Sequence, residues 1–337
     1  MKCKNIAKIL VATILMGFFS VYPSTTKAEV SIGTKNKLHK LTTTQQNKNL
    51  SQNEYDIAVN KMLQMGWSSK EIADLPYDDI IDYAEAISYS KNSQFLRYYI
   101  DDNNIEQVTS ISENLFDFET NFEKSKTNKV NKIAGMSSDG KLEISPIWNS
   151  SSETNVYNST GYLKQDQYLT WLGNNTYFTS YRWEWVIQTE NTKKDVFYIC
   201  NQMDLTPIEG TESYVYKYDF TRDNDSVIVR TYENFTPTAT KKTSDGIAYT
   251  VDLKDMEAVT SSDNYCYTRF TNSRGYMSYK MKVSSSSTGT SVSGGYYHCK
   301  SPVVINPSVT FNGLTISVSP SSFYVEESPG TSVSVVK

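Results

Sequence analysis

Histidine is scarce in this chain, and its scarcity limits the chemistry that the protein can perform. Only two histidines occur among 337 residues. His39 lies in a polar stretch near the N-terminus, so a serine triad or a Cys–His pair would depend on His298. His298 and Cys299 are adjacent on a predicted strand, where their side chains point to opposite faces and cannot form a dyad. Pairs of His298 with Cys200 or Cys266 stay open, whereas a multi-histidine metal site cannot be built.

Carboxylates are plentiful, and Glu184 is the most informative of them. It lies between Trp183 and Trp185 and shares a strand face with Arg182. A glycosidase needs one protonated and one ionised carboxyl flanking the sugar bond, and apolar surroundings raise the pKa of the acid. We favour the simpler interpretation, in which Glu184 is a surface strand residue paired with a basic side chain.

Three aspartates near one predicted turn could supply oxygen ligands for Ca²⁺: Asp219, Asp223 and Asp225. The spaced glycine and distal glutamate of a helix-loop-helix calcium loop are missing, and turn formation alone explains Asp-Asn-Asp. The chain has no Gly-rich phosphate loop, Cys-x-x-Cys pair or Gly-x-Ser-x-Gly elbow. Calcium is therefore the one cofactor that we consider, and we expect none.

Aromatic side chains form two stripes with the spacing of strand faces. Such rings can stack on the C–H faces of sugars when they are exposed, or form the core when they are buried. We expect the Trp-containing stripe to be core and leave the Tyr stripe open. The candidate ligand-binding residues are Tyr181, Trp183 and Trp185 in one stripe and Tyr214, Tyr216 and Tyr218 in the other.

The C-terminal part of the chain has the period-two pattern of β-strands. One long strand covers about 177–188, and residues 213–220 and 226–234 form a hairpin around a polar turn. Three further strands at 264–270, 276–283 and 291–300 are expected to form a meander. Short strands with frequent turns and no intervening helices predict an antiparallel β-sandwich or barrel-like domain over residues 145–337.

The N-terminal part is predicted to contain a signal peptide and a helical unit. Residues 1–28 have a basic start, an apolar run and a small-residue cleavage site, and residues 29–50 form a polar, flexible tether. Residues 51–120 form the helical unit, with a helix at about 52–65, a second that begins at the Ser68–Glu71 capping box and a third opened by Pro76. Residues 121–144 form a linker. The fold class is therefore α+β.

Three cysteines remain after residues 1–28 are removed: Cys200, Cys266 and Cys299. An exported protein could form one disulfide and keep one free thiol, or bury all three as small apolar side chains. In a meander the strands of Cys266 and Cys299 lie about two spacings of ~4.8 Å apart, beyond the ~7 Å that a bridge allows between Cα atoms. A bridge would then have to involve Cys200.

The net charge and the predicted export limit the classes of partner that we expect for this protein. Removing the four lysines of the signal peptide changes the formal net charge from −4 to −8, which disfavours nucleic acid as a partner. No stretch after residue 28 approaches the ~18 apolar residues of a transmembrane helix. Frequent Lys, Asn, Ile and Tyr with little Ala indicate an AT-rich bacterial genome, and the oligomeric state stays open.

We therefore predict a secreted, extracellular binding protein without catalytic activity, whose partner is a glycan or cell-surface polymer. One alternative is a membrane-active, pore-forming-like β protein that uses the Ser/Thr/Gly-rich stretch 282–295 as a hairpin. The other is a glycoside hydrolase that uses Glu184 and a second acid.

Overall fold

A computed structural model gives the fold. The structure describes residues 39–40, 50–102, 106–133, 160–188, 194–222, 228–233, 239–253, 257–261, 264–284, 287, 289–299, 307–319, 321, 324–326 and 331–336. The predicted signal peptide and most of the predicted tether lie outside these residues.

A small helical unit comes first, and local sequence signals set its boundaries. It contains α2 (Leu50–Gln64), α3 (Ser69–Ile72), α4 (Tyr77–Ile81) and the 3₁₀ helix η1 (Asp82–Glu85). Gly66 ends the first helix with φ 88°, a left-handed conformation that favours glycine. Ser68 and Glu71 form the predicted capping box, and Pro76 is the N-cap of α4. The first three helices therefore begin close to the positions that the sequence signals predict.

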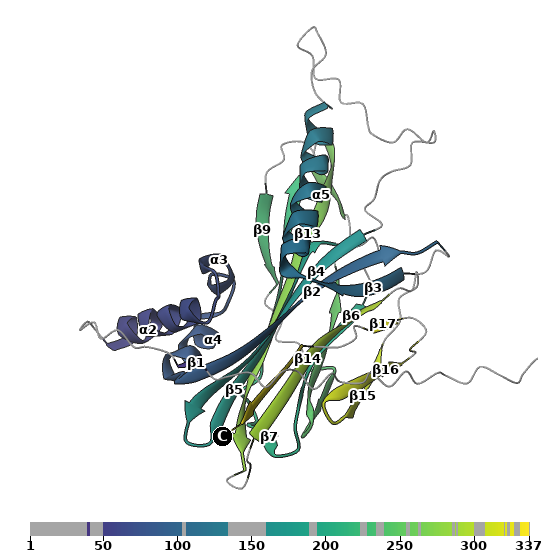
Figure 1. Cartoon of the computed structure of the whole chain (residues 1–337). Coiled ribbons are helices and arrows are strands. Elements are labelled where there is room, and N and C mark those ends of the chain that lie inside the picture. The colour runs from purple at the N-terminus through teal and green to yellow at the C-terminus, as the bar shows by residue number, and fades with distance from the viewer. Residues whose placement is uncertain are drawn as a thin grey trace, which may run out of the picture.

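A large antiparallel sheet carries the helical unit on its outer face (Figure 1). Its main path has the order β1-β2-β4-β5-β13-β8-β9, while β3 pairs with β2, and β7 and β12 pair with β13. The strands are β1 (His39–Lys40), β2 (Ser88–Ile100), β3 (Glu106–Ile111), β4 (Thr160–Gly173), β5 (Thr176–Ile187), β7 (Leu205–Pro207), β8 (Ser213–Arg222), β9 (Ile228–Glu233), β12 (Glu257–Ser261) and β13 (Asn264–Val283). This sheet is called sheet A below.

Sheet B packs against the inner face of sheet A. Its path is β10-β11-β6-β14-β17, with β18 also paired to β14, and a separate hairpin of β15 and β16 covers its outer side. The strands are β6 (Lys194–Asn201), β10 (Lys241–Thr243), β11 (Gly246–Asp252), β14 (Gly289–Cys299), β15 (Ser308–Asn312), β16 (Thr315–Ser319), β17 (Tyr324–Glu326) and β18 (Thr331–Val336). The α+β class, a helical unit followed by a mainly antiparallel sandwich, is confirmed.

The space between the two sheets is filled largely by aromatic rings. Trp183 and Trp185 are fully buried there, and Tyr296 of sheet B lies 5.0 Å from Trp183 between ring centroids. Gly275 faces Trp183 across the β5–β13 pair, and a Cβ at position 275 would lie 2.4 Å from the Trp183 indole nitrogen. Glycine is therefore required at this position so that the ring can lie against the backbone of the neighbouring strand.

Two predicted boundaries are wrong. The predicted helical unit includes residues 88–100 and 106–111, which instead form β2 and β3, and β2 pairs with β4 along nearly its whole length. The predicted linker 121–144 is occupied up to Ile133 by the helix α5 (Glu113–Ile133), and residues 134–144 lie outside the described chain. Because strands from both sides of this segment form one sheet, it does not separate a helical from a β domain.

The predicted meander is also wrong. Residues 264–283 form the single strand β13, in which Asn272 has φ 55° and the register shifts between Thr271 and Arg274. The Asn-Ser-Arg-Gly sequence thus forms a bulge instead of a turn. Cys200 and Cys299 are both buried in sheet B and form no disulfide with each other, which excludes one of the two bridges that Cys200 could make. The side chain of Cys266 lies outside the described residues.

Candidate functional site: a charged cleft under the helical unit

A belt of charged side chains crosses the outer face of sheet A. Side chains alternate between faces along a strand, so the residues of β5 that flank the buried Trp183 point toward the helical unit. The strand register places Asp166 of β4 opposite Arg182 of β5, and Glu184 opposite Arg274 of β13. Arg274 in turn lies opposite Lys217 of β8. Four neighbouring strands thus bring their charges to one row.

Arg182 is the centre of the first half of this belt. Its Nη2 donates to Glu184 Oε2 at 2.8 Å and also to Glu71 of α3, and its Nη1 lies 3.5 Å from Asp166. Glu71 simultaneously accepts the backbone N–H of Ser68 at 2.6 Å, so one carboxylate caps the helix and holds it to the sheet. The guanidinium carbon also lies 5.8 Å from the Trp67 ring centroid, a cation–π arrangement.

Arg274 is the centre of the second half. Its Nε and Nη2 donate to the two carboxylate oxygens of Asp74 at 2.5 and 3.2 Å, which is bidentate geometry. Its Nη1 donates to Asp219 of β8 at 3.1 Å, and Lys217 Nζ lies 3.9 Å from Asp74. Two arginines of the sheet thereby fix two acids of the helical unit.

Opposite charges set the protonation states in this belt. Burial alone would raise the pKa of Asp166, but Lys164, Lys91 and Arg182 together hold that pKa below its ordinary value. Burial works against the charged form of Arg182, and its three carboxylate neighbours nevertheless raise its pKa. The neighbouring opposite charges thus favour the charged forms of both Asp166 and Arg182.

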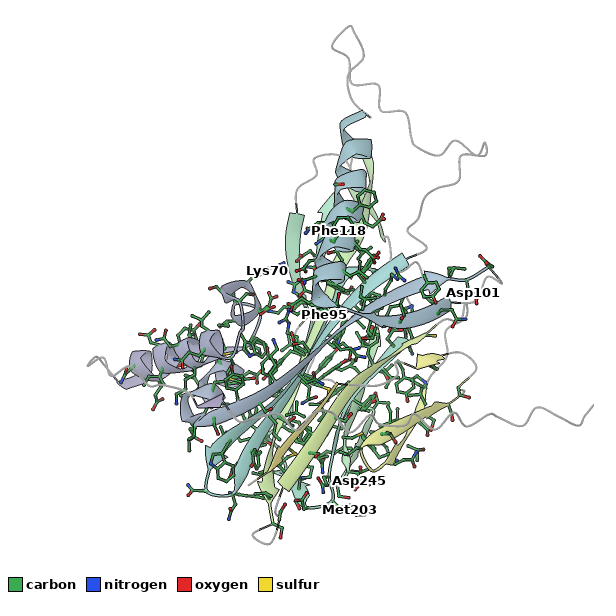
Figure 2. All side chains as sticks on the ribbon, viewed as in Figure 1. Lys70, Phe95, Asp101, Phe118, Met203 and Asp245 are labelled. Carbon is green, nitrogen blue, oxygen red and sulfur yellow. The ribbon has the colours of Figure 1, made fainter. Side chains whose placement is uncertain are left out.

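A cleft of about 150 Å³ opens beside the belt, between α3 and sheet A. Trp67, Leu75, Val215 and Tyr276 form part of its wall. The polar lining consists of Ser68, Lys70, Glu71, Asp74, Arg182, Glu184, Lys217 and Arg274. Lys70, labelled in Figure 2, is exposed at the rim of the cleft on α3. The cleft offers donors, acceptors and ring edges within a small volume.

The six aromatic residues proposed as ligand contacts do not reach this cleft. The exposed fraction is at most 5 % for each of Tyr181, Trp183, Trp185, Tyr214, Tyr216 and Tyr218. All six point into the core between the sheets. Sheet B covers the face that carries both stripes, so the Tyr stripe, which the sequence left open, is part of the core together with the Trp stripe.

The candidate calcium residues receive no support. The Asp219 carboxylate accepts hydrogen bonds from Arg274 and from Asn272, the latter at 2.9 Å, so protein donors occupy both of its oxygens. Asp223 and Asp225 lie outside the described residues. No group of three or more His, Cys, Asp or Glu side chains is placed to hold a metal ion in the described part of the chain.

Glu184 has the structural role that we favoured. Both Glu184 and Glu71 bind the same guanidinium, which is the arrangement of a partly buried ion-pair network. A glycosidase instead needs one protonated and one ionised carboxyl on either side of a sugar bond. Glu184 thus helps to hold the Arg182 guanidinium, which in turn binds Glu71 of α3.

His298 lies in the core between two carboxylates. Its Nδ1 is 2.8 Å from Asp195 Oδ2, and its Nε2 is 3.6 Å from Glu106 of sheet A. The Asp195 carboxylate also accepts the Tyr296 hydroxyl and the backbone N–H of Cys299. Burial alone lowers the pKa of His298, but the two carboxylates raise it above 6.5. This cluster joins the two sheets and has no opening to solvent through His298, which is fully buried.

The stretch 282–295 does not form a separate hairpin. Its described residues end β13 and begin β14, and β14 is paired on both sides within sheet B. Val283 and Val292 are buried in the main core. Moving this stretch would therefore break both sheets. No described helix is long and apolar enough to cross a membrane.

Sequence reasoning found only part of the belt. The shared face of Arg182 and Glu184 and the capping box of Glu71 were visible, but the functions of Asp74 and Arg274 were not. These two residues are 200 positions apart in the chain. No local pattern could have linked them.

Comparisons with known proteins give distant structural likenesses. No family model matches the chain, and no curated protein matches it. The collagen-binding domain of Erysipelothrix rhusiopathiae surface protein RspB is 10% identical with a TM-score of 0.21, and the match covers 52% of this chain and 62% of that one. A collagen-binding domain from a Staphylococcus aureus adhesin is 7% identical with a TM-score of 0.18, covering 48% and 88%. A pore forming protein is 4% identical with a TM-score of 0.23, covering 55% and 86%.

Proposed function

We propose that this chain is a secreted binding protein without catalytic activity, and that its ligand is a glycan of a cell surface or matrix. The charged cleft between α3 and sheet A is the proposed binding site. The observation that carries this proposal is the pairing of charges in the cleft, where every arginine is already bound to carboxylates.

Compensated charges select a neutral, polyhydroxylated ligand. A sugar hydroxyl can accept a hydrogen bond from a guanidinium and donate one to a carboxylate, so a neighbouring acid and base can bind the same hydroxyl as acceptor and donor. An isolated phosphate or sulfate would instead have to displace Glu71 or Asp74 from the arginines. The indole of Trp67 and the ring of Tyr276 add apolar wall that suits the C–H face of a sugar.

The size of the cleft limits what can enter it. About 150 Å³ is below the roughly 300–1,000 Å³ of pockets that enclose drug-sized ligands. The cleft therefore accommodates a single sugar unit, such as the end or one side residue of a polysaccharide.

The test is glycan binding by the mature protein and by a variant that leaves the ion pairs intact. Lys70→Ala removes an exposed side chain at the rim, and Lys241→Ala removes an exposed lysine of β10 as the matched control. Binding to a glycan array, followed by calorimetry on the retained sugars, should weaken for Lys70→Ala and stay unchanged for Lys241→Ala. Failure of the unmutated protein to retain any neutral glycan, or equal weakening by both variants, refutes the cleft as a glycan site.

A further inference from the structure

The helix α5 presents an apolar stripe to solvent. Leu115, Phe118 and Phe122 follow each other at spacings of three and four residues, which places them on one helical face. Their exposed fractions are 40%, 70% and 53%. Large apolar side chains grouped in this way mark interaction surfaces.

The opposite side of α5 is fixed to sheet A, so the stripe cannot turn inward. The Phe116 ring lies 5.1 Å from Phe95 of β2 and 5.9 Å from Tyr162 of β4, measured between ring centroids. Arg97 of β2 donates to Glu119 of α5 at 3.0 Å. Figure 2 shows Phe118 on the helix and Phe95 on the strand near its base.

The charge of α5 is divided along its length. Its second half contains Lys124, Lys126, Lys129 and Lys132, and the sequence has no acidic residue between positions 124 and 138. The acidic residues lie in the first half, where Glu119 is bound by Arg97. Figure 1 shows α5 at the end of the molecule that lies away from β7 and the β15–β16 hairpin.

We propose that α5 is a membrane-docking helix that lies on anionic lipid surfaces. Helices that bind in the plane of the membrane interface combine Phe, Trp or Leu on one face with many lysines or arginines. In α5 the apolar stripe is combined with the lysines of the second half. Basic residues are attracted to the negative headgroups of anionic lipids, and the sequence of the second half of α5 has four lysines and no acidic residue. A membrane contact made by α5 uses residues distinct from the charged cleft.

The experiment is cosedimentation of the mature protein with vesicles. Phosphatidylcholine vesicles with and without phosphatidylglycerol are compared for the unmutated protein and the double variant Phe118→Ser, Phe122→Ser. Met203→Ser is the control, because Met203 is 88% exposed and lies between β6 and β7, at the other end of the molecule (Figure 2). All three substitutions are at exposed positions, so melting temperatures should be unchanged.

We expect the unmutated protein and the Met203→Ser control to bind anionic vesicles, with binding that weakens as salt increases. The double variant should bind at least about tenfold more weakly. When anionic vesicles are added, the fluorescence emission of a Phe118→Trp variant should shift to shorter wavelength, and brominated lipids should quench it. The unmutated protein should show smaller changes under the same conditions.

Equal vesicle binding by the double variant would overturn the proposal, as would absence of vesicle binding by the unmutated protein. A concentration-dependent dimer that the double variant loses, without vesicle binding, would assign the stripe to a second copy of the chain instead.

Discussion

Asp79 is a buried carboxyl group at the junction between the helical unit and sheet A. It lies in α4 with 8% of its surface exposed, and one of its oxygens accepts the Ser213 hydroxyl of β8 at 2.7 Å. Burial raises the pKa of Asp79 to about 6 from 3.8. The hydrogen bond from Ser213 partly offsets this effect, while the charges of Asp82 and Asp78 add to it.

The sign and size of the effect follow from proton linkage. Between pH 3.8 and about 6 the folded chain binds a proton at Asp79 that the unfolded chain has released, so the free energy of unfolding falls as pH rises through this window. A pKa difference of about two corresponds to a penalty of about 3 kcal/mol at neutral pH. Asp79→Asn removes the charge, and its amide oxygen can still accept the hydroxyl of Ser213.

Urea unfolding followed by tryptophan fluorescence measures this effect. Below pH 3.8, Asp79→Asn and the unmutated protein should have the same free energy of unfolding. The difference should grow in favour of the variant as pH rises and reach about 2–3 kcal/mol above pH 6. The exposed neighbour is the control, since Asp78→Asn should give less than about 0.5 kcal/mol. A gain that does not depend on pH, or a loss of stability at neutral pH, would show that the carboxyl is not desolvated as described.

Three further predictions concern the core and the charged belt. Tyr216→Ala should lower the free energy of unfolding by about 3–5 kcal/mol because the ring is buried; a loss below about 1 kcal/mol in chemical denaturation contradicts this placement. Arg274→Met leaves Asp74 and Asp219 without their guanidinium, so it should lower the free energy of unfolding by about 3–5 kcal/mol, and limited proteolysis should cut the helical unit first. A helical unit as resistant to protease as in the unmutated protein would refute the anchoring function of Arg274. His298 has a raised pKa, so its charged form stabilises the fold below pH 6.5 and this stability is lost as pH rises through the folded pKa; an imidazole that titrates below 6.5 by NMR contradicts the contacts.

The sequence alone determined the elements whose signals are local. The capping box of Ser68 and Glu71, the glycine stop at Gly66 and the alternation along 177–188 predict structure within a few residues, and each is present. The hairpin of β8 and β9 likewise follows from two alternating runs around a polar turn. Fold class could be predicted because it depends on the sum of such signals.

Strand assignment failed where the partner lies far away. Residues 88–100 have a mixed pattern that also fits helices, and they become β2 by pairing with β4, which begins at Thr160. Asn272 in a left-handed conformation lets β13 continue through a segment that resembles a turn. Long-range pairing overrides local preference in both places.

Tertiary structure alone decided which residues face a ligand. Alternation shows that Tyr216 and Lys217 point to opposite faces of sheet A, but it does not show what covers each face. Sheet B covers the Tyr side and the helical unit covers the charged side, so the rings become core and the charges border a cleft. Burial depends on contacts between segments as distant as Asp74 and Arg274, and a period of two carries no information about such contacts.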